Sequence, residues 1–531
     1  MSTLARGRAD VPAMADKSDH RRILEALSGL LLVLFVAMIS STIVSTALPR
    51  IIGALKGTQE QYTWVVTATL LAATVTTPIW GKLADLFPKK SLIQIAIVIF
   101  AIGSIACGFA QNAGQLIAFR AFQGLGVGGL QALVQVAIAA MIPPRERGRY
   151  NGYLGAVMAV ATVSGPLLGG LIVDASWLGW RWCFWVGVPI AVLSLLLLAK
   201  TLKLPHTRRE VRIDYLGASL IAAGVSVLLI WVSFVGSSFD WISWQTAAML
   251  LPSVVLLVLA VYVESRVAEP IVPMHVLRNR TTALAIVASL AVGMAMFGGS
   301  VFLGLYFQVG RGYTPTEAGL LTIPLMIGVL LSSTISGQLI TRTGKIKPFI
   351  LIGTVVLVAG FLLLGTVDHQ SSLWLLGCYM ALVGVGVGMT MQNLVLAVQN
   401  TVALKDLGAA SSTVAFFRSL GGTIGVSVLG AVLANKVTAG MASGLAAMGH
   451  DLPAGTQVSA NLDVASLPAP IQSLVHVTYG DSVASIFMIS ALIGLISVLA
   501  AVLLPKIVLR TTVDLPDNKP AAAPQDGVPT A

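Results

Sequence analysis

The sequence predicts an all-α membrane protein with fourteen transmembrane helices, arranged as two six-helix bundles with two further helices inserted between them. Of the 531 residues, 56% are hydrophobic and only 10% are charged, whereas about a quarter of an ordinary soluble domain is charged. Apolar runs of about 20 residues, long enough for a helix to cross the hydrocarbon of a bilayer, recur from end to end. Glycine patterns also recur at one constant spacing in the two halves of the chain.

The apolar runs give the order of the elements. The first run is too long for the core of a signal peptide, so we interpret it as a helix that is retained. We predict helices at residues 28–48, 63–84, 91–111, 116–141, 150–173, 182–203, 214–236, 246–264, 282–308, 317–340, 348–367, 374–399, 408–434 and 482–504.

An internal repeat relates the first six helices to the last six. GKLADLFPKK begins at Gly81 and GQLITRTGKI begins at Gly337, which is 256 residues later. The same offset relates the glycines of GPLLGG at 165–170 to those of GGTIGV at 421–426. Two patterns that share one offset indicate a duplication, with the seventh and eighth helices as an insertion between the copies.

The repeat and the composition divide the chain into segments. We predict a cytoplasmic N-terminal segment (1–27), an N-terminal bundle (28–203), a linker with the two inserted helices (204–281), a C-terminal bundle (282–504) with an outer loop (436–480), and a cytoplasmic tail of a composition typical of disorder (505–531).

The positive charges indicate the orientation. With the N-terminus in the cytoplasm, 26 of the 33 Lys and Arg residues lie on the inner side, five lie outside, and Arg120 and Arg418 lie within helices. Such an asymmetry in short loops places both termini in the cytoplasm of a multi-pass protein of the cell membrane. It also accounts for the net charge of +11, so the lipid bilayer is a predicted partner and a nucleic acid is not.

Enzymatic chemistry is not indicated. The sequence contains no GxxxxGK[ST] for nucleotide phosphates and no HExxH for a catalytic metal. Its three cysteines fall in or beside apolar runs without metal-ligand spacing, as packing residues do. We therefore expect no metal and no cofactor, and an ion gradient as the source of energy for any transport.

A charged motif follows the second predicted helix. Gly81 permits close approach of another backbone, Asp85 is suited to bind the N-terminus of a neighbouring helix or a cation, and Lys89 and Lys90 anchor the loop at the membrane interface. The motif predicts a gate that closes the inner side. A cluster of charges that only fixes topology is the alternative. The second copy has Thr341 where the first has Asp85, so only the first half carries the acid.

Seven segments together resemble the major facilitator superfamily and, within it, the fourteen-helix drug:proton antiporters. They are STIVSTALP (41–49), WVVTATLL (64–71), GKLADLFPKK (81–90), RAFQGLGVGG (120–129), GPLLGG (165–170), WRWCFWVGVP (180–189) and FFRSLGGTIGV (416–426). The resemblance implies export of small amphiphilic compounds in exchange for protons, and a gating role for Asp85.

Two arginines within apolar helices are the candidates for proton coupling. Arg120 is costly in lipid unless it faces a wet cavity or a partner, and Gln131 and Gln135 lie within about 60° of it around the same helix. The resemblance links Arg120 to proton transfer, whereas snorkelling to the interface is the alternative. Arg418 matches the FFRSLGG segment, and it is suited to pair with an acid or a backbone carbonyl.

The GPLLGG segment predicts a site of close packing and bending in the fifth helix. Pro166 lacks a backbone donor, and Gly165, Gly169 and Gly170 let another helix approach. The resemblance makes this motif characteristic of exporters, although Ala161 replaces a glycine that is often found earlier in the pattern.

Candidate substrate-cavity residues combine aromatic, flexible and amide side chains. They are Phe302 and Tyr306 in the ninth helix and Met389, Gln392 and Asn393 in the twelfth, and ordinary packing is the alternative for each. Ser40 is a further candidate, because it stands where fourteen-helix antiporters usually have an acid before the TIV run. Since no acid lies near the middle of any predicted helix, dications are disfavoured as substrates, and neutral, zwitterionic or anionic amphiphiles fit better.

The leading interpretation is thus a secondary-active multidrug or metabolite exporter, most simply driven by proton antiport. A dedicated exporter of one lipid or natural product is a second interpretation. A membrane scaffold or sensor that transports nothing is a third, and it predicts that loss of Arg120 or of Gly165 and Pro166 has no effect.

Overall fold

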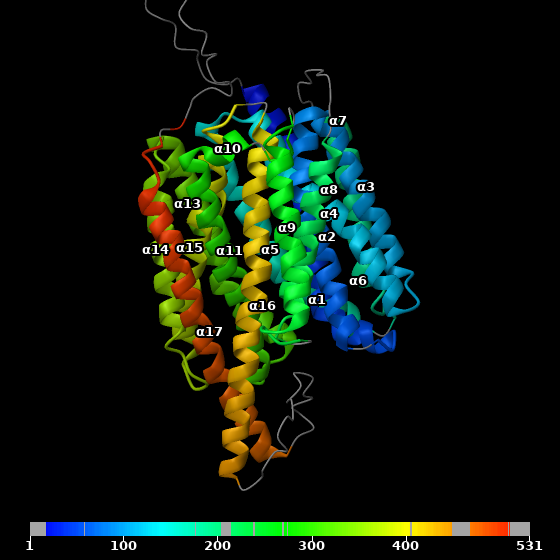
Figure 1. The fold of residues 1–531 in the computed structure, drawn as a ribbon, viewed down its shortest axis with the longest axis vertical. Helices are drawn as coiled ribbons and strands as arrows, with labels where there is room; N and C mark the ends of the chain where they lie inside the picture. The colour runs from blue at the N-terminus through cyan, green and yellow to red at the C-terminus, as the bar shows by residue number, and fades with distance from the viewer. Residues whose placement is uncertain are drawn as a thin grey trace, which may run out of the picture.

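The computed structural model describes residues 17–57, 59–175, 177–202, 214–236, 239–267, 270–272, 274–403, 406–448, 468–507 and 509. These residues form a long bundle of helices (Figure 1). The predicted N-terminal segment lies outside the described residues up to residue 16, as do most of the basic linker at 203–213 and most of the tail after residue 507.

The N-terminal bundle begins with a helix that starts well before the first apolar run. Its helices are α1 (Lys17–Ala54), α2 (Gln59–Leu86), α3 (Lys89–Gly108), α4 (Ala113–Met141), α5 (Pro144–Asp174), α6 (Trp182–Trp185) and α7 (Gly187–Thr201). The helix predicted at 182–203 is interrupted, because α6 ends before Gly187 and α7 begins there.

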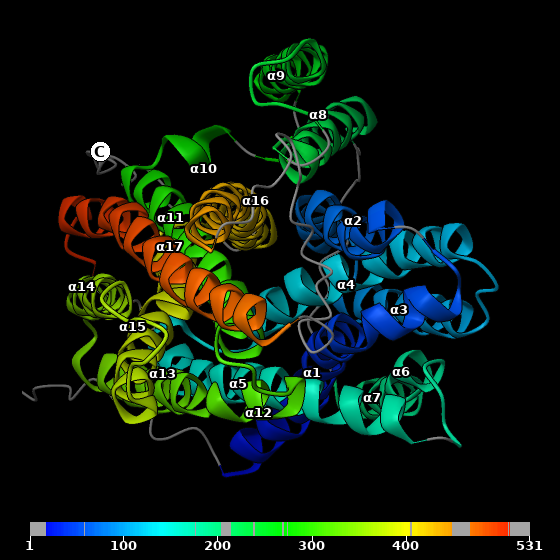
Figure 2. The ribbon, with the colours of Figure 1, turned by 90° about the horizontal axis from the view of Figure 1, so that it is seen from below.

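The inserted pair consists of α8 (Tyr215–Phe234) and α9 (Trp244–Glu264). The α8 helix packs against α9 on one side and against α2 and α16 on the other, whereas α9 lies at the periphery of the molecule (Figure 2). Large apolar side chains of α9 are exposed, among them Leu251, Val255 and Val258. This is the distribution expected of a helix that faces lipid.

The C-terminal bundle follows a short helix that lies before it. Its elements are α10 (Met274–Arg278), α11 (Arg280–Leu305) with a π-helical turn η1 (Tyr306–Gly310), α12 (Pro315–Leu321), α13 (Ile323–Thr343), α14 (Lys347–Leu364), α15 (Leu373–Gln399), α16 (Leu407–Ala447) and α17 (Ala469–Leu503).

Thirteen helical stretches of the described residues are long and apolar enough to cross a membrane. The α5 helix, whose first turns carry Arg145, Glu146, Arg147 and Arg149, is not among them. It nevertheless runs through the bundle between α1 and α13 (Figures 1 and 2). With α5 the fold has the fourteen membrane helices that the sequence predicts.

Two interfaces join the bundles, and the 256-residue offset relates them. The α2 helix of the first bundle packs against α16 of the second, and α5 packs against α13. The 256-residue offset makes α13 the repeat counterpart of α2, and α16 the repeat counterpart of α5. The α2–α16 interface and the α5–α13 interface are therefore repeat counterparts of one another. Glycines allow the close approach: a Cβ atom added at Gly152 of α5 would lie 2.9 Å from Cα of Thr334 in α13.

Both described termini lie at one face of the molecule, which we call the termini face (Figure 1). At the opposite face, α16 and α17 extend beyond the other helices as a pair (Figure 1). We call this the hairpin face. The segment 436–480, predicted as an outer loop, is helical in nearly all of its described part, because α16 continues to Ala447 and α17 begins at Ala469. Apolar contacts between the extensions, such as Val437 and Met441 with Val475, explain why they stay helical.

Tryptophans mark the hairpin-face ends of several helices. Trp177, Trp244 and Trp374 are 82%, 76% and 87% exposed, and they lie before or at the starts of α6, α9 and α15. Indole rings favour the boundary between hydrocarbon and headgroups. Their placement therefore supports a membrane around the bundle, with the α16–α17 extension beyond it.

Candidate functional site

Asp85 joins the two bundles at the termini face. Its Oδ1 accepts a hydrogen bond from the backbone N–H of Gly408, and its Oδ2 accepts one from the N–H of Ala409, both at 2.8 Å. These amides belong to the first turn of α16, where backbone donors lack partners within their own helix. A carboxylate at this point is also stabilised by the helix dipole. The contact holds α2 of the first bundle against α16 of the second.

The rest of the motif supports the approach of α2 to α16. A Cβ atom added at Gly81 would clash with the Ser412 side chain and lie 2.7 Å from the Gly408 carbonyl oxygen. Lys89 is the first residue of α3 and acts on Asp85 through its charge. Lys90 donates a hydrogen bond to the carbonyl of Ala199 in α7, at 2.6 Å. Lys90 thus ties the start of α3 to α7, whereas Lys89 lies close enough to Asp85 for its charge to act there.

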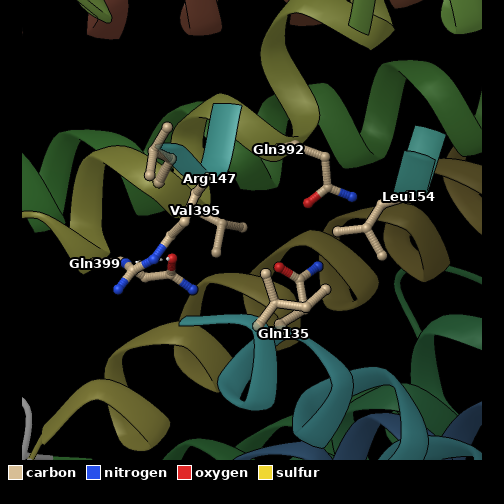
Figure 3. A pocket seen from close by; sticks show the side chains of 8 residues that line it. Gln135, Arg147, Leu154, Gln392, Val395 and Gln399 are labelled. Atoms are coloured by element: carbon tan, nitrogen blue, oxygen red, sulfur yellow. Dashed lines mark hydrogen bonds between the residues drawn. The ribbon is translucent and has the colours of Figure 1, made fainter. Parts of the chain in front are cut away.

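A second link between the bundles lies at the same face. The buried guanidinium of Arg147, near the start of α5, donates to the backbone carbonyls of Ala139 and Ile142 and to Oε1 of Gln399 in α15, at 3.1 Å. Gln399 in turn donates to Oγ of Ser411, at 3.0 Å. Arg147 and Gln399 point toward one another beside a small cavity (Figure 3). This link ends on Ser411, at the start of the second turn of α16, directly after the turn that Asp85 holds.

Sequence reasoning missed Arg147 as a site residue and counted it only as one of the inner positive charges. Its pairing with Gln399 spans 252 residues, and no motif spacing connects the two. The one available signal was its place next to the Pro143-Pro144 helix start, where an arginine can turn back onto the carbonyls of the preceding helix.

Arg120 lies within a buried polar network of the N-terminal bundle. Its Nη1 donates to Oε1 of Gln123 at 2.8 Å. The amide of Gln123 donates to Ser104 at 2.6 Å and lies 3.4 Å from Oγ of Ser40. Arg120 also donates to the carbonyl of Val65 at 3.4 Å. With only 3% of its surface exposed, Arg120 does not snorkel.

The predicted polar stripe on α4 is divided. Gln123, which the sequence analysis did not single out, is the amide that contacts Arg120. Gln135 lies about four turns beyond Arg120 along α4. There it lines the cavity of Figure 3 together with Gln392 of α15. Gln131 is half-buried between them. Arg120 and Gln135 therefore belong to two different polar regions.

Arg418 lies about three turns into α16 and is buried. Its Nη1 is fully buried and has no hydrogen-bond partner among the described residues. Its backbone packs closely on α11, since a Cβ atom added at Gly293 would clash with the Arg418 carbonyl. A buried guanidinium nitrogen without a partner is suited to an anionic ligand.

The glycines of GPLLGG bring α5 against two helices. A Cβ atom at Gly165 would clash with the Thr42 side chain of α1, and one at Gly170 would lie 3.3 Å from Oγ1 of Thr316 in α12. Gly169 is buried. Pro166 lies within α5, and its side chain is outside the described set.

The predicted substrate-cavity residues separate into two groups. Phe302 and Tyr306 are buried in the core of the C-terminal bundle, where Tyr306 donates to the carbonyl of Asp368 at 2.7 Å. Met389 faces α14, and Asn393 donates to the Met389 carbonyl of its own helix. Only Gln392 lines the cavity of Figure 3, and Ser40 lies beside Gln123. For the other four residues, the structure thus shows packing within the bundle: Phe302, Tyr306, Met389 and Asn393.

The family model of the Major Facilitator Superfamily matches residues 30–426. The chain belongs to the Major Facilitator Superfamily. This major facilitator protein is 36% identical over 417 residues to the multidrug transporter protein MdtP of Bacillus subtilis, covering 78% of this chain and 76% of the relative. It is 33% identical over 410 residues to Multidrug resistance protein 3 of the same organism, covering 77% and 79%.

A solved structure confirms the fold. The major facilitator proton:xylose symporter XylE matches with a TM-score of 0.58 at 14% identity, covering 92% of this chain and 98% of that chain. The protein is therefore a multi-span membrane transporter of the major facilitator type, not an enzyme by family or fold.

Proposed function

We propose that this protein exports small amphiphilic compounds across the cell membrane by proton antiport, with the termini face in the cytoplasm. The observation that carries the proposal is the 36% identity to a multidrug transporter over 78% of the chain. The export direction is supported by the GPLLGG segment, whose glycines pack α5 against α1 and α12. No cofactor is needed in this proposal, since the proton gradient supplies the energy.

The geometry at the termini face supports alternating access. Asp85 and the pair Arg147–Gln399 both join the bundles at this face. Opening toward the cytoplasm requires both links to break, and closing restores them. Rocking of one bundle against the other around a central site is the common mechanism of transporters built from repeats.

The charges within the bundle support a class of substrate. Arg120 and Arg418 are buried, whereas the acids of the described helices lie near the ends of the spans, except Asp481, which lies 12 residues into the last span and pairs with His369 at 3.1 Å. A buried cation favours substrates that are neutral, zwitterionic or anionic, and a dication would enter without a carboxylate to bind it.

Efflux assays test the proposal. A panel of anionic, neutral and cationic dyes is measured in cells that lack or overproduce the protein, with and without an uncoupler, with the Arg120→Ala variant as the inactive comparison. Several substrates whose efflux stops with the uncoupler are the expected result. Efflux of a single compound would favour a dedicated exporter. No efflux at normal abundance would favour the scaffold or sensor.

A further inference from the structure

Two acids meet at the termini-face end of the inserted helix pair. Asp214 is the N-cap of α8, and its Oδ1 accepts a hydrogen bond from the N–H of Gly217 at 2.8 Å. Glu264 is the last residue of α9, and its Oε2 accepts one from the N–H of Val272 at 2.9 Å. Each carboxylate thus uses one oxygen to hold the backbone.

The other oxygen of each carboxylate is left without a partner. Oδ2 of Asp214 and Oε1 of Glu264 are both fully buried and have no hydrogen-bond partner among the described residues. The two side chains belong to residues that are only 8% and 2% exposed. Unpaired buried oxygens cost free energy unless a donor satisfies them, and a carboxylate can accept but not donate when it is ionised.

Both unpaired oxygens lie close to Gly217. A Cβ atom added at Gly217 would clash with Oδ2 of Asp214 and lie 2.6 Å from Oε1 of Glu264, so the oxygens are at most about 5 Å apart. The absence of a side chain at Gly217 leaves the space between them free. Two buried negative charges at this separation repel one another, and a proton bound between them removes one of the two charges.

The charges of the neighbouring helices do not supply the missing donor. Lys82 of α2 is the cation whose charge acts on Glu264, but it donates to neither unpaired oxygen. Asp85 of α2 is bound to the first turn of α16. Asp406, which precedes α16, pairs with His275 of α10 at 3.1 Å. Arg266, just beyond α9, stacks over the ring of Tyr262.

A proton fits this site better than a metal ion. Metal cations such as Ca²⁺ and Mg²⁺ take about six or more oxygen ligands, and no group of three or more acidic, histidine or cysteine side chains suited to a metal occurs among the described residues. One proton converts one carboxylate into a donor to the other, so it satisfies both oxygens at once and halves the buried charge.

We propose that Asp214 and Glu264 form a proton-binding site that holds one proton between Oδ2 of Asp214 and Oε1 of Glu264. The site goes beyond the proposed export, because it needs no substrate and no turnover. It lies in the insertion rather than in either repeat. Because α8 packs against both α2 and α16, release of this proton changes the charge beside the two helices that Asp85 joins.

Infrared spectroscopy tests the site directly. The purified protein in lipid nanodiscs is examined near neutral pH for the carbonyl absorption of a protonated carboxyl, in the wild type and in Glu264→Gln and Asp214→Asn. Both variants keep the shape of the side chain, and asparagine still caps a helix. The control is Glu317→Gln, because Glu317 lies in an exposed capping box of α12. We expect one absorption that is lost in both variants and retained in the control. An absorption unchanged in Glu264→Gln would overturn the proposal.

Thermal unfolding provides a second readout that needs no transport. If the folded pair binds one proton more than the unfolded chain does, this proton adds to the free energy of unfolding. Its contribution is fully present at low pH and is lost as the pH rises and the pair releases the proton. We expect this fall of the melting temperature in the wild type and in Glu317→Gln, but not in Glu264→Gln. A higher melting temperature in sodium than in choline salt, seen in the wild type but not in Glu264→Gln, would show that the site binds a metal cation instead of the proton. None of these results depends on whether the protein exports by proton antiport, so the two proposals fail independently.

Discussion

Asp85 connects two helices whose contacting residues are 323 positions apart. Both of its oxygens are used, each by one amide of the α16 first turn. The contact therefore requires a carboxylate, because a carboxamide can accept with only one of its two terminal atoms.

Asp85→Asn should weaken the closed state of the termini face. The lost bond to a charged group is worth about 1.5–3 kcal/mol, which corresponds to a shift of about tenfold or more between closed and open states. We expect the maximal efflux rate to fall by about this factor while substrate affinity stays near that of the wild type. Rate and affinity are measured in proteoliposomes, and an equal loss of binding with unchanged turnover would contradict the role of a gate.

Arg120→Ala should abolish export while the protein still inserts. The substitution leaves Gln123 without its charged partner and removes the cation from the network with Ser104 and Ser40. Arg120→Lys should restore export only in part, because an ammonium keeps the charge without the planar fork of donors. Efflux is compared at matched abundance in the membrane. Unchanged efflux of Arg120→Ala would remove this residue from the mechanism.

Ser40→Asp should change the selectivity for charge. Ser40 lies 3.4 Å from the amide of Gln123, which binds Arg120, so the new carboxylate would compete for the same polar groups and offset the buried positive charge. We expect efflux of a cationic dye to rise by several-fold relative to an anionic one in matched cells. If the ratio of the two rates does not move, the charge at this network does not select substrates.

At the scale of elements, the sequence predicted the helices better than their ends. Apolar length identified every membrane helix, because a helix needs about 20 apolar residues to cross the hydrocarbon. The repeat spacing, which comes from duplication, paired the helices of the two halves. The ends of α16 and α17 were wrong, since residues such as Val437 and Val475 stay helical by packing on one another beyond the predicted spans. For the site, the motif correctly placed Asp85 beside a helix N-terminus. Arg147, however, depends on a tertiary contact with Gln399, which no local pattern encodes.

The first two turns of α16 should behave as one unit held from two sides. Asp85 binds its backbone, and Gln399 binds Ser411 while accepting from Arg147. We expect Gln399→Leu to slow efflux by less than Asp85→Asn, and the double variant to depart from additivity by about 0.5–3 kcal/mol, as groups in one network do. A double-mutant cycle on the efflux rate measures this. Gln135→Leu, in the same cavity, is the control, and strict additivity would show that the links act separately.

At the scale of the whole molecule, the orientation in the membrane remains a prediction from the positive charges. In a Cys378→Ser background, which removes the exposed cysteine, single cysteines are introduced at Ser443 in the hairpin extension and at Ser265 beyond α9. We expect an impermeant reagent added to intact cells to label position 443 and not 265, because the hairpin face is outside. Labelling of position 265 from outside would reverse the proposed topology.

The contacts of the inserted helices restrict how the two bundles can move relative to one another. The α8 helix contacts α2 of the N-terminal bundle and α16 of the C-terminal bundle at once, whereas α9 contacts chiefly α8 (Figure 2). If the bundles rotate relative to one another, α8 cannot remain fixed to both. It must move with one bundle and slide along the other. One of its two helix contacts therefore persists during the movement, and the other must be able to break and re-form.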